Sequence, residues 1–246
     1  MMPQNERHQT CEASYNAQLE RDCIEHFQNL CDLNDPSHDP SHTSRVLEQA
    51  KRFAIIEHAS LSVVIPAAVF HDVVNYRKDD PRSGGAVDES AAVAETFLRA
   101  RGCSESACKR VGAAIRTCSF SRGIRPTSIE GMVVKDADLL EQSGAIAIMR
   151  TFASCGQMNR SLFDRKDPFA QHRPLSPSEF GLDLFEARLL RIREHLSTEA
   201  ARITLDTRER FLLTFVDQLR QELRVEETSL PRGFDASKLN SSLLDR

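Results

Sequence analysis

Most of the chain shows the hydrophobic spacing of amphipathic α-helices. In residues 15–30, four apolar side chains fall on one helix face, namely Leu19, Cys23, Phe27 and Leu30. The same spacing recurs in residues 45–59, 91–102, 185–196 and 208–223. Strand-like alternation is scarce, and valine and isoleucine mostly sit inside helical patterns. The pattern predicts an all-α fold of about eight to ten helices.

The two ends of the chain and one internal stretch lack this periodicity. Residues 1–12 are polar and are predicted to be a flexible N-terminus, and residues 226–246 a loose C-terminal tail. Residues 13–225 would then form one helical domain. Within it, residues 155–178 contain three prolines, and a loop of this length is either a functional lid or a long surface connection.

Composition and charge narrow the class of protein. The chain has 246 residues, 40% of them hydrophobic and 28% charged, which is ordinary for a globular protein with a real core. Its net charge is −4, so general nucleic-acid binding, which usually needs a basic excess, is not expected. A local basic cluster for a small phosphorylated ligand remains compatible with that charge.

The cellular compartment of the protein is inferred from targeting signals and from the cysteines. No apolar leader opens the chain, and no apolar run approaches the roughly 18 residues of a membrane span. The seven cysteines are odd in number and include no C-x-x-C pair. We therefore expect a cytoplasmic protein with reduced thiols and no membrane association.

An apolar run, residues 64–70, ends abruptly in His71-Asp72. An ionised aspartate next to buried core is costly unless it is paired or bound to a cation. A core histidine beside a helix-capping aspartate would explain the pair as well, and a second such pair occurs at His38-Asp39. The pair indicates a metal or catalytic site only if further ligand residues join it from elsewhere in the chain.

Two other segments offer such partners. His42 lies in the first turn of a predicted helix, where a plain polar helix start is the alternative. Asp136 and Asp138 lie in a segment that is apolar nearly all round, where an ion pair with an arginine such as Arg150 is the alternative. Two histidines and two aspartates suit Mn, Fe, Co, Ni or Zn, and also Mg when more oxygen ligands are present. Such a divalent metal site leaves positions for water and a phosphate oxygen.

The order of these residues resembles the HD-domain metal-dependent phosphohydrolases, and among them a single-domain bacterial branch. No single motif is specific, but the joint order and spacing of the motifs are. Six segments carry the resemblance, over roughly residues 20–225: SHDPSHTSRV at 37–46, FHDVVNYRK at 70–78, CSFSRG at 118–123, KDADLLEQSGAIAIMRTF at 135–152, DPFAQHRPL at 167–175 and LDLFEARLL at 182–190.

The resemblance implies a helical HD-domain bundle that holds a divalent metal. The ligands that it implies are His42, His71, Asp72 and Asp138. Asp138 is preferred over Asp136 because the family ligand is the aspartate of an Ala-Asp pair, although both aspartates of the D-A-D motif are compatible with the pattern.

The resemblance also implies an activity, the hydrolysis of a nucleotide or similar small phosphorylated metabolite through a metal-activated water. Asp72 or Asp136 would accept a proton. Arg45 matches the family as well, and either contacts the substrate or braces His42 or Asp72. Basic residues would hold the phosphate oxygens: Lys78, which matches a lysine of the branch and is counted with the catalytic residues, then Arg77, Arg82 and Arg173.

Four positions depart from the family pattern. Cys118 and Leu184 stand where the branch usually has histidine, and Leu139 stands where it usually has arginine. Asn75 stands where some superfamily nucleotidases have an acid/base glutamate. These departures favour a second hypothesis, a degenerate HD module that binds a ligand or partner without hydrolysis. A helical scaffold with a purely structural His–Asp cluster is the third.

Overall fold

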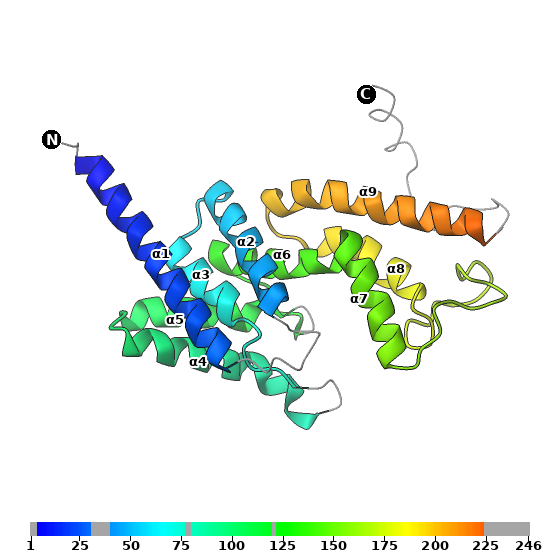
Figure 1. Cartoon of the computed structure of the whole chain (residues 1–246), viewed down its shortest axis with the longest axis horizontal. Coiled ribbons are helices and arrows are strands. Elements are labelled where there is room, and N and C mark those ends of the chain that lie inside the picture. The colour runs from blue at the N-terminus through cyan, green and yellow to red at the C-terminus, as the bar shows by residue number, and fades with distance from the viewer. Residues whose placement is uncertain (1–3, 31–39, 77–79, 120–121, 224–246) are drawn as a thin grey trace, which may run out of the picture. The chain divides into compact units, whose positions relative to one another are not determined.

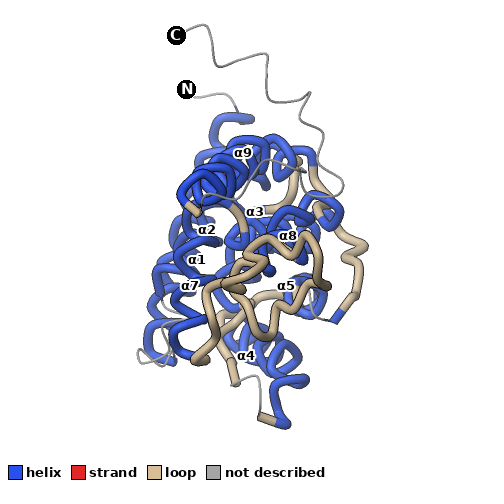
Figure 2. The backbone as a smooth tube through the Cα atoms, turned by 90° about the vertical axis from the view of Figure 1, so that its right-hand side faces the viewer, coloured by secondary structure: helices blue, strands red, loops and turns tan. Residues whose placement is uncertain are grey.

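The computed structural model describes residues 4–30, 40–76, 80–119 and 122–223. Within these ranges the chain is helical and contains no strand, which confirms the predicted all-α fold (Figure 2). The α-helices, shown in Figure 1, are α1 (Gln4–Leu30), α2 (Pro40–Ile56), α3 (Leu61–Phe70), α4 (Ala86–Ala100), α5 (Glu105–Cys118), α6 (Ile129–Leu139), α7 (Gly144–Gln157), α8 (Asp183–Ala187) and α9 (Glu199–Glu222). None of these helices is both long and apolar enough to cross a membrane.

The chain divides into two compact units. The first consists of Met1–Glu141 with Leu196–Ala201, and the second of Gln142–His195 with Arg202–Arg246. Helix α1 begins at Gln4, inside the segment 1–12 for which flexibility is predicted. The predicted C-terminal tail, residues 226–246, lies outside the described residues.

Helix α3 is the centre of the first unit. Its sequence is apolar apart from Ser62, and every residue from Val63 to Phe70 is buried. An α-helix that is apolar on all sides needs neighbours on all sides, and α3 packs against α1, α2, α5 and α6. This burial fixes the direction of the α3 axis and hence the position of the residues that follow it.

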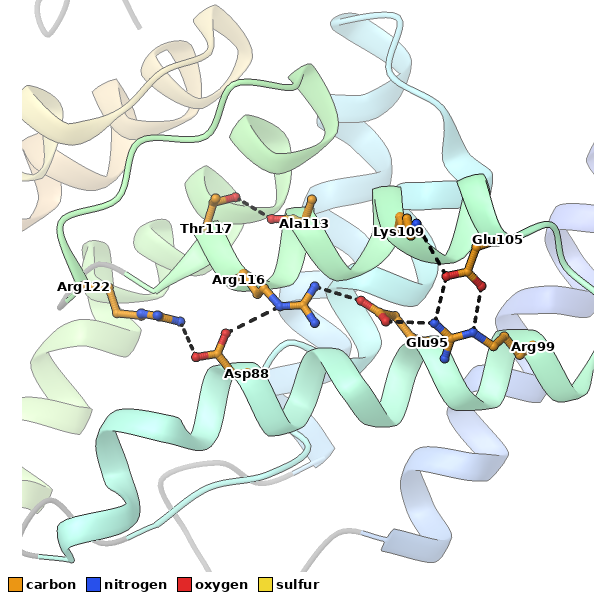
Figure 3. Close-up of polar contacts among 9 residues, drawn as sticks. All are labelled: Asp88, Glu95, Arg99, Glu105, Lys109, Ala113, Arg116, Thr117 and Arg122. Carbon is orange, nitrogen blue, oxygen red and sulfur yellow. Dashed lines mark hydrogen bonds and ion pairs between the residues drawn. The ribbon is translucent and has the colours of Figure 1, made fainter.

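Ion pairs join α4 to α5 along one side of the first unit (Figure 3). Arg116 of α5 reaches two carboxylates of α4, with Glu95 Oε1 at 2.8 Å and Asp88 Oδ1 at 3.5 Å. Arg99 of α4 pairs in turn with Glu105 of α5. The helix pair is thus held by apolar packing on its inner faces and by charges at its rim.

The second unit has its own core. Six buried residues from α7, α8 and α9 and the segments beside α8 form it: Ala147, Leu182, Phe185, Leu189, Leu212 and Val216. Residues 158–182 follow α7 and contain a single isolated bridge, between Ser161 and Phe180. The stretch predicted as an irregular loop, residues 155–178, is therefore helical only to Gln157.

Candidate metal centre

The burial of α3 places His71 and Asp72. His71 is the C-cap residue of α3 and is 1% exposed. Its Nδ1 lies 2.8 Å from the carbonyl oxygen of Ala68. A carbonyl oxygen can only accept, so Nδ1 carries the proton and Nε2 keeps a lone pair.

The Nε2 atom of His71 tests whether these residues fit a metal. It is buried and makes no hydrogen bond within the described residues. Two carboxylates face it, with Asp72 Oδ2 at 3.6 Å and Asp138 Oδ1 at 3.9 Å. These separations are too long for hydrogen bonds, but they are shorter than twice a metal–ligand bond of about 2.0–2.2 Å. The arrangement fits a divalent cation shared by the imidazole and the carboxylates.

His42 enters the same cluster from the first turn of α2. Its ring centroid lies 5.4 Å from that of His71, and its Nε2 lies 3.6 Å from Asp138 Oδ1. Ligand atoms of His42, His71 and Asp72 all lie within 4.8 Å of one another. The structure thus brings together the four residues that the resemblance implies as metal ligands.

The cluster has a closed side and an open side. His42 is 3% exposed, whereas the side chains of Asp72 and Asp138 are 32% and 21% exposed. Burial alone would lower the pKa of His71, but the carboxylates of Asp72 and Asp138 and the hydrogen bond to Ala68 raise this pKa on balance. The carboxylates therefore create a potential that favours cations on the side that solvent reaches.

Asp136 turns away from this cluster and serves another contact. Its carboxylate is fully buried and accepts hydrogen bonds from the backbone N–H of Ser197 and Thr198, at 2.9 and 2.7 Å, and from Thr198 Oγ1 at 2.8 Å. Burial raises the pKa of Asp136, and these hydrogen bonds offset part of the rise. The contacts anchor the start of α9, and they favour Asp138 over Asp136 as a metal ligand.

Glu141 is a buried member of the cluster that the sequence analysis did not single out. Its Oε2 lies 3.4 Å from His42 Nδ1 and accepts a 2.8 Å hydrogen bond from Arg45 Nε. Burial alone would raise the pKa of Glu141, but the hydrogen bonds from His42 and Arg45 lower it on balance. The sequence signal that could have found it is an acidic residue directly after the apolar pair Leu139-Leu140, three positions after Asp138.

The structure describes only some of the basic residues that are predicted to contact phosphate. Lys78 and Arg77 lie outside the described residues. Arg82 pairs with Asp80, with Nη2 to Oδ2 at 2.8 Å, and its guanidinium lies 4.3 Å from the ring centroid of Tyr76. The pairing with Arg82 lowers the pKa of Asp80 to about 2.

Arg173 belongs to the second unit and is held by that unit. It donates to both carboxylate oxygens of Asp183, at 2.6 and 2.8 Å, and its guanidinium lies 4.5 Å from the ring centroid of Phe180. Asp183 is buried and also accepts the backbone N–H of Ser176. These contacts of Arg173 hold the segment before α8 against Asp183.

Three of the four positions that depart from the family pattern lie beside or just after the candidate ligands: Leu139, which follows Asp138 directly, Cys118 and Asn75. Cys118 ends α5 and is buried, and burial together with the charges of Asp72 and Asp138 raises the pKa of its thiol well above the usual value. The thiol is therefore neutral near pH 7. Asn75, three residues after Asp72, is exposed.

Comparison with known proteins assigns the family. Residues 41–143 match the family model of the HD domain. An uncharacterised protein of Bacillus subtilis strain 168, YpgQ, is 30% identical over 200 residues, which are 80% of this chain and 89% of YpgQ. The chain belongs to the HD-domain family. HD domains bind divalent metals, and the His42, His71 and Asp72 cluster of this HD domain could hold one.

Solved structures agree with this assignment. The crystal structure of YpgQ in complex with ADP has a TM-score of 0.65 at 26% identity and covers 84% of this chain and 96% of the other. An HD-superfamily hydrolase from Bacillus thuringiensis has a TM-score of 0.68 at 25% identity and covers 86% of this chain and 100% of the other. These relatives support a hydrolase, in general a metal-dependent phosphohydrolase.

Proposed function

We propose that this HD domain hydrolyses a phosphate ester or anhydride of a nucleotide with the help of a divalent metal. The observation that carries the proposal is the convergence of two buried imidazoles and two solvent-reaching carboxylates, with His71 Nε2 making no hydrogen bond in the described chain. A nucleotide is the proposed substrate because the related YpgQ has been crystallised with ADP.

The proposed metal ligands are His42, His71, Asp72 and Asp138. When bound, a divalent metal lowers the pKa of water and offsets negative charge on a phosphoryl group. The hydrogen bond from His71 Nδ1 to Ala68 fixes the imidazole so that Nε2 faces the carboxylates. Such fixed orientation spares the site from reorganising when substrate arrives.

The remaining roles fall to residues on the open side of the cluster. The Asp72 carboxylate, which solvent reaches, accepts the proton of the attacking water. Asp136 is unsuited to this step because hydrogen bonds from Ser197 and Thr198 occupy its carboxylate. Lys78 remains the first proposed contact to phosphate oxygens, followed by Arg77. Arg82 and Arg173 would have to leave their aspartate partners to join them.

The test measures the metal content of the purified protein and phosphate release from a nucleotide panel that starts with ADP. Reactions would be supplied in turn with Mn, Co, Ni, Zn and Mg. We expect release with at least one metal, and we expect His71→Ala to lose both the metal and the activity. The matched control is His195→Ala, an exposed histidine of the second unit, which should keep both. Folded wild-type protein that is inactive with every metal would contradict the proposal.

A nucleotide-binding module without hydrolysis is the second candidate function. It is favoured by Asn75, which cannot act as an acid or base, and by the neutral buried thiol of Cys118. Calorimetry with ADP and recovery of the nucleotide afterwards separates the two functions. Tight binding of ADP that is recovered intact would favour the module, and products would favour the enzyme.

A further inference from the structure

Glu141 connects the candidate metal ligand His42 to Arg45. It lies in the short 3₁₀ turn that follows α6, Leu140–Gln142, and its side chain is 5% exposed. Both Nε and Nη2 of Arg45 lie 2.8 Å from Glu141 Oε2. The same oxygen lies 3.4 Å from His42 Nδ1. A chain of three polar side chains thus runs from the outer part of α2 to the imidazole.

Arg45 is fixed at its other end as well. Its Nη1 donates a 2.8 Å hydrogen bond to Ser41 Oγ, one turn earlier on α2. The guanidinium is therefore held in the orientation that places two of its nitrogens on Glu141. Because a guanidinium has donors only, the oxygen that it contacts must act as an acceptor. Glu141 consequently presents an acceptor to His42 Nδ1, which must then carry the proton.

His42 and His71 reach the same tautomer by different means. The acceptor for His71 Nδ1 is the backbone carbonyl of Ala68, whereas the acceptor for His42 Nδ1 is a carboxylate paired with Arg45. In both rings the lone pair is left on Nε2, the atom that faces Asp138.

We propose that Glu141, held by Arg45, is a positioning residue that fixes the tautomer and orientation of His42 for metal binding. The inference rests on the metal site of the proposed function, but it does not require that the site hydrolyse anything. It assigns Arg45 to the support of His42 rather than to the substrate, and it makes a side chain 99 positions away from His42 part of the site.

The test compares the metal affinity of Glu141→Gln with that of the wild-type protein. Glutamine keeps the shape, but its amide can donate to Nδ1 and so stabilise the wrong tautomer. We expect Mn²⁺ or Co²⁺ to bind about 10- to 100-fold more weakly, as measured by calorimetry without nucleotide. The absorption spectrum of bound Co²⁺ should also change, because the ligand field includes the His42 imidazole. Glu141→Asp should recover part of the affinity.

Glu130→Gln is the matched control. Glu130 is also a buried glutamate of the same helical segment that pairs with an arginine, in its case Arg110. It should lose stability without losing metal affinity. If Glu141→Gln folds poorly, Arg45→Gln provides the second variant, since the Arg45 side chain is 37% exposed, and it should weaken metal binding by a smaller factor.

Two outcomes separate this inference from the proposed function. Unchanged metal affinity in Glu141→Gln and Arg45→Gln, beside a clear loss in His71→Ala, would overturn the positioning role and leave the metal site standing. If Glu141→Gln loses metal affinity and the wild-type protein releases no phosphate from any nucleotide, the positioning role is upheld and the proposed hydrolysis is overturned.

Discussion

The two aspartates of the D-A-D motif make entirely different contacts although they are close in sequence. Asp138 and Asp136 are two positions apart on α6, so their side chains leave the helix in directions about 200° apart. One carboxylate approaches the two histidines, and the other accepts hydrogen bonds at the start of α9. The motif therefore joins a proposed metal ligand, Asp138, to a residue that anchors the start of α9, Asp136.

This division predicts opposite effects of two similar substitutions. Asp136→Asn should lower the free energy of unfolding by about 1–3 kcal/mol, because an amide cannot accept on both sides and leaves buried donors of Ser197 or Thr198 unsatisfied. Its metal content should stay at the wild-type level. Asp138→Asn should lose metal and keep most of its stability. Urea unfolding and metal analysis of both variants measure the two effects, and metal loss in Asp136→Asn would reverse the assignment.

At the scale of elements, the ion pair between α5 and α4 lies over a position that has no side chain. Gly112 of α5 is buried, and a Cβ there would overlap Glu95 Oε1 and lie 2.6 Å from Arg116 Nη1. These are the two groups of an ion pair between the helices, shown in Figure 3. The ion pair therefore occupies space that only a glycine leaves open.

We expect Gly112→Ala to destabilise the protein by less than about 1 kcal/mol, because the methyl group displaces only the ends of two flexible side chains, those of Glu95 and Arg116. Gly156→Ala on α7 is the control, since no atom lies within 4 Å of the Cβ that it would add. That change should stabilise by up to about 0.5–1 kcal/mol through helix propensity. Urea unfolding of both variants provides the comparison, and equal effects would show that the contact with Glu95 yields at no cost.

The segment before α8 depends on Arg173 in a similar way. Arg173→Ala removes the partner of the buried Asp183 and should destabilise by about 3–5 kcal/mol. Arg191→Ala breaks an exposed pair with Glu194 and should cost less than about 1 kcal/mol. Thermal unfolding compares the two variants. A KM for nucleotide that rises in Arg173→Ala, with little change in stability, would instead support Arg173 as a phosphate contact.

At the scale of the whole molecule, local patterns predicted the helices and the chemistry of single residues, but not the pairing between distant segments. The apolar run 64–70 predicts a buried helix and a fixed position for His71, and the structure has both. Glu141 was not predicted as a site residue because its role depends on a contact with His42, which is 99 positions away in the sequence. The pairing of Arg173 with Asp183 likewise becomes visible only when the segment is folded, and the role of Arg173 as a phosphate contact stays a prediction.

Metal binding should be visible in the stability of the whole chain. A ligand that binds only the folded protein stabilises it by about 2.7 kcal/mol at 100 times its Kd, and for 150–250 residues each kcal/mol raises Tm by about 2–4 °C. We therefore expect Tm to rise by about 5–10 °C when saturating Mn²⁺ is added to protein treated with a chelator. The rise should be absent in His71→Ala, because the buried Nε2 that faces Asp72 and Asp138 is then gone. Thermal scans of both proteins with and without metal measure the shift, and an equal rise in the variant would place the bound metal elsewhere in the chain.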